Sequence, residues 1–342
     1  MPETEIKVSG KALMLHRRRL LRLGLCFLIL LVGIFLSMAM GAVEYSLKEI
    51  FHALFLEKEG FDHLILADVR LPRTLVAALV GMCLSLSGAI MQGITRNPMA
   101  SPSILGVNSG AALVTLVLFV FFPRAYYITP LAAISGALAT TLLIYAMAWK
   151  GGVAPVRFIL SGVAVSSVLG ALYSIISVMY PDAIQGMIGF SVGSLNARTW
   201  YHFRLIAPYA AVGLMASMCF TNKLNLLAMG DEIATGLGLK VEQTRMMLIV
   251  ISALMAGSAI SVVGQISFVG LCVPHVTRLL IGSDYRYLLP ASAINGASMV
   301  IYCDWLARII IRPQEMNVGI IIAVLGAPFF LYLLRRKGGY QM

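Results

Sequence analysis

Three arginines lie beside long apolar runs, and arginine side chains are suited to binding anions. Arg70 and Arg73 flank a leucine and a proline immediately before one apolar run, and Arg308 lies at the end of another. A guanidinium group presents a planar fork of donors that can bind a carboxylate through two hydrogen bonds. These arginines are therefore candidates for docking acidic groups of another protein. The alternative is that they only extend to water at a membrane surface.

The second candidate is the stretch 230–239, GDEIATGLGL, which is polar and glycine-rich between apolar runs. Negative charge is stabilised at the amino end of a helix, so Asp231 and Glu232 predict a helix start. Gly236 or Gly238 can end that helix. Small side chains would let another protein approach closely, although a solvated helical hairpin is the alternative. The predicted contact residues are Gly230, Asp231, Glu232, Ala234, Thr235, Gly236 and Gly238.

Catalytic and metal centres find little support in the sequence. Cys272 and His275 have a ligand-like spacing but lack a second ligand pair, so we expect no metal site. Ser109 and His275 could serve an intramembrane serine protease only within hydrogen-bond reach of each other. The stretch 236–240, GLGLK, lacks the spacing and the hydroxyl of a phosphate-binding loop. We therefore expect no catalytic residue and no cofactor bound by this chain.

The elements that position these residues are predicted to be membrane-spanning helices. The chain of 342 residues is 59% hydrophobic, and a span needs roughly 20 apolar residues. We predict a polar tail at 1–19 and one all-α transmembrane domain at 20–336, with a cytoplasmic loop at 222–245. Ten crossings are expected, near 20–43, 72–94, 106–121, 128–148, 155–180, 201–221, 246–263, 264–282, 286–309 and 317–334. The eighth is interrupted, with a short helix only near 274–282.

The distribution of charge gives the orientation of these spans. The segments that alternate with the basic tail carry the whole net charge of +11, and the opposite segments are neutral in sum. Basic residues concentrate on the cytoplasmic side of membrane proteins. Both termini are therefore expected in the cytoplasm, and the basic charge requires no nucleic-acid partner.

Two similar stretches, 86–106 and 255–278, each contain a helix rich in small residues, a glutamine, a broken segment and then a proline. One follows an inward span and the other an outward span, which indicates an inverted repeat with halves at about 72–180 and 246–334. Polar or adaptable groups near the breaks are candidates for a transport pathway or for helix packing. They are Met91, Gln92, Asn97, Pro98 and Gln265. Asp304 and Arg308 are spaced to pair along one helix face.

Three blocks of sequence resemble the FecCD family of permeases for ferric siderophores, haem and vitamin B12. They are 70–111, 268–297 and 315–334, and the resemblance covers residues 20–336. It implies a BtuC-like type II ABC importer permease in the bacterial cytoplasmic membrane. The implied partners are a second permease subunit, an external binding protein and ATPase subunits that hold ATP and Mg. It also implies docking by Arg70, Arg73 and Arg308, and coupling through 230–238.

We therefore predict the permease of an importer for a ferric siderophore-like chelate, with haem or cobalamin as alternative cargoes. An ion-coupled secondary transporter would share the broken helices and the inverted repeat. Such a transporter normally needs ionisable residues within the membrane, and Asp304 is the clearest acid inside a predicted span.

Overall fold

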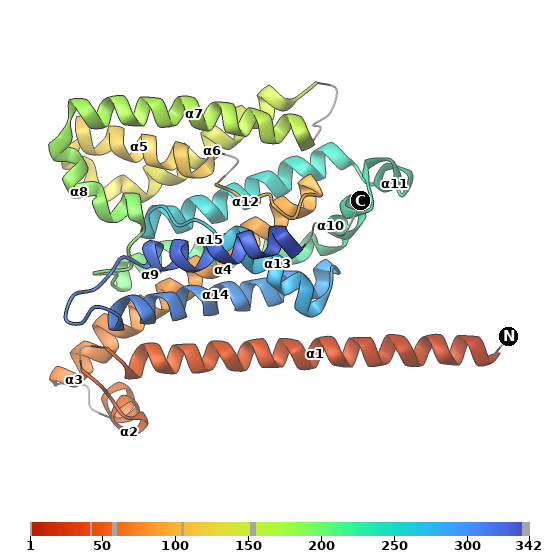
Figure 1. The fold of residues 1–342 in the computed structure, drawn as a ribbon, viewed down its shortest axis with the longest axis horizontal. Coiled ribbons are helices and arrows are strands. Elements are labelled where there is room, and N and C mark those ends of the chain that lie inside the picture. The colour runs from red at the N-terminus through yellow and green to blue at the C-terminus, as the bar shows by residue number, and fades with distance from the viewer. Residues whose placement is uncertain (1, 42, 57–59, 104–105, 151–154, 337–342) are drawn as a thin grey trace.

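The computed structural model is all-α and describes residues 2–41, 43–56, 60–103, 106–150 and 155–336 (Figure 1). The long helices are α1 (Pro2–Ala39), α4 (Leu71–Thr95), α5 (Val107–Phe121), α6 (Thr129–Ala148), α7 (Pro155–Met179), α9 (Trp200–Cys219), α12 (Val241–Val263), α13 (Val269–Ile281), α14 (Tyr285–Ile309) and α15 (Val318–Arg336). Shorter ones are α2 (Leu47–Phe51), η1 (His52–Leu56), α3 (Phe61–His63), η2 (Leu64–Arg70), η3 (Pro123–Ile128), α8 (Pro181–Val192), α10 (Thr221–Ala228) and α11 (Asp231–Gly236).

Five helical stretches of the described chain are long and apolar enough to cross a membrane, and a sixth is the bent pair α9 and α10. The helices α5, α13 and the apolar part of α15 are shorter. Each predicted crossing coincides with a helix, but the count of ten stays a prediction. Helix lengths along the two predicted repeats follow a similar order, with a short helix after the first long one in each.

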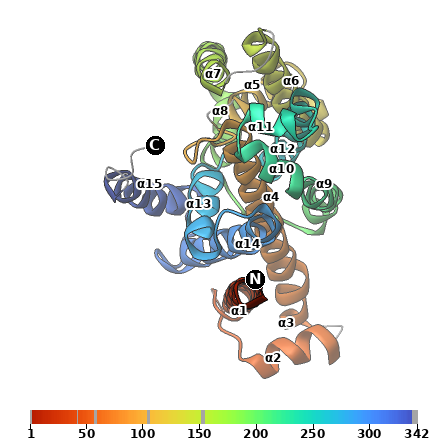
Figure 2. The ribbon, with the colours of Figure 1, turned by 90° about the vertical axis from the view of Figure 1, so that its right-hand side faces the viewer.

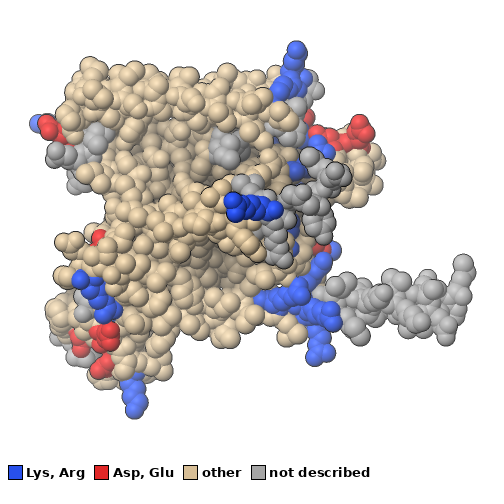
Figure 3. Space-filling model, viewed as in Figure 1, with Lys and Arg blue, Asp and Glu red and all other residues tan. Residues whose placement is uncertain are grey.

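The bundle is built around α4, which packs against α9, α12, α13 and α14 (Figure 2). Helices α2, α3 and α8 lie at one end, which we call the α8 end (Figure 1). Helices α10 and α11 and the beginning of α1 lie at the other, the α11 end. In Figure 3 the charged side chains gather toward these two ends, and the band between them is mostly uncharged. This is the surface that a bilayer-embedded protein requires.

The structure adds detail at three places and corrects one predicted helix start. The tail at 1–19 is helical from residue 2 and continues into the first span as α1. The short helix predicted at 274–282 begins earlier, at Val269, and runs through Pro274. Packing against α4 and α14 holds α13 together despite the hydrogen bond that proline removes. Residues 241–245, within the predicted loop at 222–245, are the first turns of α12.

Glycine pairs allow the central helices to touch backbone to backbone. Gly81 of α4 faces Gly296 of α14, and Gly88 of α4 faces Gly270 of α13. A side chain at Gly81 would overlap the carbonyl group of Gly296. In a membrane, where lipid is as apolar as leucine, such close packing replaces the hydrophobic effect as the force between helices.

These contacts predict that Gly81→Ala lowers the thermal stability of the purified chain, by about 1–3 kcal/mol, because its methyl group meets a backbone atom that cannot rotate away. Gly170→Ala is the matched control, since no atom lies within 4 Å of the position its methyl group would take. Melting in detergent, followed by size-exclusion chromatography, measures both. Equal melting of the two variants would contradict the packing argument.

Candidate functional site

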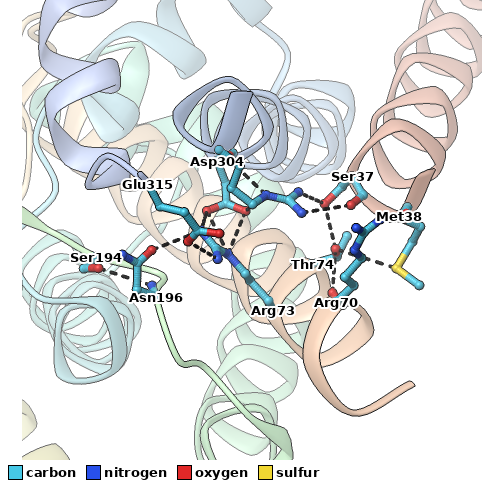
Figure 4. Close-up of polar contacts among 10 residues, drawn as sticks. Ser37, Met38, Arg70, Arg73, Thr74, Ser194, Asn196, Asp304 and Glu315 are labelled. Atoms are coloured by element: carbon cyan, nitrogen blue, oxygen red, sulfur yellow. Dashed lines mark hydrogen bonds and ion pairs between the residues drawn. The ribbon is translucent and has the colours of Figure 1, made fainter. Parts of the chain in front are cut away.

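The α8 end contains a group of charged residues that we call the arginine cluster: Arg70, Arg73, Arg308, Asp304 and Glu315 (Figure 4, in which Arg308 is unlabelled). Arg73 lies in the first turn of α4 and binds Asp304 of α14 through Nη2, at 2.8 Å from Oδ1. Its Nε donates to both carboxylate oxygens at 3.1 Å. Its Nη1 lies 2.7 Å from Glu315 Oε2. One guanidinium group therefore joins α4, α14 and the segment before α15.

The other two arginines join this cluster to α1. Arg308 Nε lies 3.3 Å from Asp304 Oδ2, and its two terminal nitrogens donate to the carbonyl and hydroxyl oxygens of Ser37 at 3.1 and 2.7 Å. Arg70 donates to the Met38 carbonyl at 2.6 Å, and its guanidinium lies 5.0 Å from the centre of the Tyr45 ring. The predicted pairing of Asp304 with Arg308 is thus present.

Burial changes the interpretation of the three arginines. Arg70, Arg73 and Arg308 are each only 6–7% exposed, and Asp304 is 1% exposed. The structure therefore places them inside the α8 end, with their donors already bonded, and not as free groups on its surface. Glu315, with 40% of its side chain exposed, is the part of the cluster that reaches solvent.

Several members of this site had no signal in the sequence. Glu315 and Asn196 both bind Arg73, Asn196 through its side-chain oxygen at 3.1 Å. Both lie outside the long helices, where no periodicity relates them to Arg73. Ser37 lies in α1, and nothing in its local sequence separates it from other small residues on membrane helices.

At the α11 end, the stretch 230–239 forms the helix that was predicted. Helix α11 begins at Asp231 and ends at Gly236, and both Gly230 and Gly238 have a positive φ. Asp231 accepts a hydrogen bond of 2.9 Å from Arg245, whose side chain is only 2% exposed. Arg245 also binds Glu242, at 2.6 Å. Because this arginine fastens the start of α11 to α12, the loop is a braced element and not a loose connector.

The surface of α11 is unusually apolar for a loop element. Ile233, Leu237 and the preceding Met229 are between 50% and 61% exposed. No atom outside the local backbone lies within 4 Å of where a side chain at Gly236 would begin. An exposed apolar patch of this kind commonly marks a contact with another protein.

The same end is closed by Asp284, the N-cap of α14. Its hydrogen bonds with Arg286 are the main cause that lowers the pKa of Asp284 to about 2, with a further contribution from Asn225 of α10. Arg19 of α1 lies 3.6 Å away. One carboxylate therefore links α1, α10 and α14 beside α11.

The structure separates the residues predicted for a pathway. Met91 and Gln92 are buried in α4, and Gln92 accepts from Arg278 and donates to the Leu271 carbonyl. Both side chains are therefore packed between helices in this structure. The Asn97 side chain accepts a hydrogen bond from the backbone amide of Met99 in a turn that also contains Pro98. The backbone amide of Gln265 donates to the Phe190 carbonyl. The pathway role of all five stays a prediction.

The residues considered for other chemistries lie on different helices. Ser109 is in α5, whereas His275 is buried in α13. Across the described residues, no three side chains of His, Cys, Asp or Glu come together as a metal site would require.

The cluster predicts that Asp304→Asn strongly destabilises the chain, by about 3–5 kcal/mol, because it leaves two buried guanidinium groups without their shared counter-charge. Glu315→Gln removes a carboxylate from the same arginine at an exposed position, so its effect is expected to stay below about 1 kcal/mol. Thermal melting in detergent compares them. If Asp304→Asn melts like Glu315→Gln, the buried pair does not hold this end together.

Comparison with known proteins shows similarity along nearly the whole chain. The sequence model of the FecCD transport family matches residues 29–336. An Fe(3+)-citrate import system permease protein of Bacillus subtilis is 37% identical over 93% of this chain and 95% of its own. An iron(3+)-hydroxamate import system permease protein of the same organism is 38% identical over 92% and 82%.

Relatives named for other cargoes are equally similar. A hemin transport system permease protein of Yersinia pestis is 36% identical over 93% of this chain and 96% of its own. A cobalamin import system permease protein of Halobacterium salinarum is 41% identical over 80% and 74%. A solved inward-facing structure of a putative metal-chelate type ABC transporter has a TM-score of 0.83 at 27% identity, covering 92% of this chain and 98% of that one.

Proposed function

The chain belongs to the FecCD transport family and is an ABC importer permease of the metal-chelate type, and we propose that its cargo is a ferric siderophore-like chelate. As a permease subunit it is not an enzyme, which removes the protease alternative built on Ser109 and His275. Membership of this family also explains the broken helices as those of an ABC importer permease, in place of an ion-coupled secondary transporter.

The proposal of a ferric siderophore-like cargo rests on the match, at 37% and 38% identity, to permeases named for ferric citrate and ferric hydroxamate. Both are oxygen-rich ferric chelates, the chemical class to which siderophores belong. The similar match to hemin and cobalamin permeases keeps those two as the competing cargoes.

The cargo is tested in proteoliposomes that contain the chain with its cognate ATPase and binding protein, with ATP and Mg supplied on the ATPase side. We expect ferric hydroxamate or ferric citrate to stimulate ATP hydrolysis and to accumulate inside in an ATP-dependent manner. Haem and cobalamin are the comparison substrates. Stimulation by haem or cobalamin alone would contradict the siderophore-like cargo while leaving the permease assignment intact.

We propose that α11 is the element through which the ATPase subunits drive the permease. Support comes from its exposed apolar residues and from the Asp231–Arg245 bond that ties it to α12. Helix α12 in turn packs on α4 at the centre of the bundle. A displacement of α11 would therefore be transmitted through α12 to α4 at the centre of the bundle.

Gly236→Trp tests this coupling without disturbing the chain itself, because the position is open in the isolated subunit. We expect ATP-dependent uptake to fall by about tenfold or more, since the added ring separates α11 from the ATPase surface, while thermal stability is unchanged. Gly24→Trp, equally open but on α1, is the matched control. Normal uptake by the Gly236 variant would show that α11 is only a connector.

For the α8 end, we propose that an external binding protein docks over the arginine cluster, with Arg70, Arg73 and Arg308 supplying the attraction. Arg73 and Arg308 are paired with two carboxylates, Asp304 and Glu315, whereas Arg70 bonds backbone carbonyls and adds a positive charge without a carboxylate partner among the described residues. Only Glu315 is exposed, so an acidic side chain of the partner would replace it on Arg73 Nη1. Charge reversal at Arg73 is an unsuitable test because it would face Asp304 inside the protein.

Glu315→Gln is therefore the informative variant for docking. The substitution removes the carboxylate that competes for Arg73 Nη1. We therefore expect the binding protein to bind about three- to tenfold more tightly. Glu44→Gln removes an exposed carboxylate, the partner of Arg312, from the same end and is the control. Affinities are measured by surface plasmon resonance on nanodisc-embedded complex. Weaker or unchanged binding by Glu315→Gln would contradict the exchange.

The orientation follows from the same assignment. We propose that the α11 end, the beginning of α1 and the end of α15 face the cytoplasm of a bacterial cell, and that the α8 end faces outward. The basic residues around Arg19 and Arg22 at the α11 end support this. A second permease subunit, either a copy of this chain or a paralogue, would complete the passage.

A further inference from the structure

A cavity of about 700 Å³ lies at the α8 end, away from the arginine cluster's contacts with α1. It is enclosed by η3, the start of α6, α8, the segment 193–199, the start of α9 and the end of α12. Its polar lining comes from Thr129, Ser194, Asn196, Arg198 and His202. No acidic residue is among the residues that line it.

Arg198 is the unusual member of this lining. Its Nε is buried without a hydrogen-bond partner, and one terminal nitrogen lies 3.2 Å from His202 Nε2. Within the described parts of the chain, Arg198 forms no ion pair. Burial is the main cause that lowers the pKa of Arg198, and the nearby positive charge of Arg73 adds to it. A half-buried guanidinium with a buried, unbonded Nε lacks the anion that normally accompanies it.

An apolar groove continues from the cavity along the bundle. A second hollow of about 340 Å³ shares Tyr127, Pro130 and Tyr201 with the first. Its other walls are Leu131 and Ile134 of α6, and Leu205 and Pro208 of α9, with Arg204 and Tyr209 beside them. Helices α6 and α9 both pack on α12. The groove too has no acidic residue in its lining.

Exposed side chains lie where the two hollows meet. Tyr127 and Tyr201 are 65% and 56% exposed at their junction, and Leu131 is 59% exposed beside the groove. Tyrosines with this exposure are typical of the boundary between hydrocarbon and head groups. A polar, cationic cavity thus adjoins an apolar groove, with exposed tyrosines between them.

We propose that this pair of hollows is a binding site for a phospholipid with an anionic head group. The phosphate oxygens accept hydrogen bonds from Arg198, whose planar fork matches them, while Arg204 adds positive charge at the rim. One acyl chain lies in the groove between α6 and α9. Basic pockets between membrane helices bind lipid head groups in this manner. The proposal requires only that the chain is embedded in a bilayer, and it does not depend on the cargo.

The test is native mass spectrometry of the full-length chain, delipidated in detergent and titrated with phosphatidylglycerol. Phosphatidylcholine of the same chain length and inorganic phosphate are separate arms. We expect saturable binding of one phosphatidylglycerol, with binding of phosphatidylcholine about tenfold or more weaker. Binding of inorganic phosphate without binding of phosphatidylglycerol would overturn the lipid assignment. Equal binding of both lipids would overturn the anionic head group.

Two variants separate the site from general lipid adhesion. Arg198→Gln is expected to weaken phosphatidylglycerol binding about tenfold or more, because a charge-assisted contact to phosphate is lost. Leu131→Trp, which covers the groove, should weaken the lipid but leave inorganic phosphate unaffected. Arg312→Gln, an exposed arginine at the same end and paired with Glu44, is the control and should bind lipid normally.

Thermal melting distinguishes binding from a merely structural role. In lipid-free detergent, Arg198→Gln should melt no earlier than the unaltered chain, since it removes a buried charge without a counter-ion. Added phosphatidylglycerol should raise the melting temperature of the unaltered chain and of Arg312→Gln, but not of Arg198→Gln. An equal lipid-induced shift in all three proteins would overturn the proposal.

Discussion

A carboxylate shared by two buried guanidinium groups is the interaction on which the α8 end of this protein depends. Asp304 is 1% exposed and lies between Arg73 of α4 and Arg308 of α14. A buried charge is tolerated only when it is paired and its remaining lone pairs are bonded. The pairing therefore sets the rotation of α14 against α4, and the bonds from Arg308 to Ser37 bring α1 into the same arrangement.

A similar arrangement of ion pairs, with the charges reversed, lies at the α11 end. There a buried arginine, Arg245, holds the exposed acids Asp231 and Glu242 and so fixes a short helix against α12. Between the two ends the helices meet through glycine and serine contacts, such as Ser87 against Ser252 at 2.6 Å. The molecule thus has ionic braces where water begins and small-residue packing within the hydrocarbon, as the properties of the two solvents require.

Electrostatic balance also explains why the two proposed surfaces of the α8 end differ. In the arginine cluster most positive charge is neutralised internally, and only the exposed Glu315 can be exchanged for an outside acid. Arg198 has no ion-pair partner among the described residues. It lines a cavity that continues into an apolar groove. The first arrangement suits a reversible protein contact. The second suits an anion that carries its own hydrocarbon.

The sequence alone indicated the membrane environment and the family, because apolar run lengths and three separated blocks are local or cumulative signals. Its one-sided basic charge predicts the orientation, which stays a prediction. The sequence also placed α11, whose acids and glycines encode both of its ends, and the pair Asp304–Arg308, which one helical turn brings together. Only the tertiary structure decided that Arg73 is buried against Asp304, 231 positions away, and that Glu315 and Asn196 also bind it. Such contacts depend on how separate helices pack, and no periodicity within one helix specifies its neighbours.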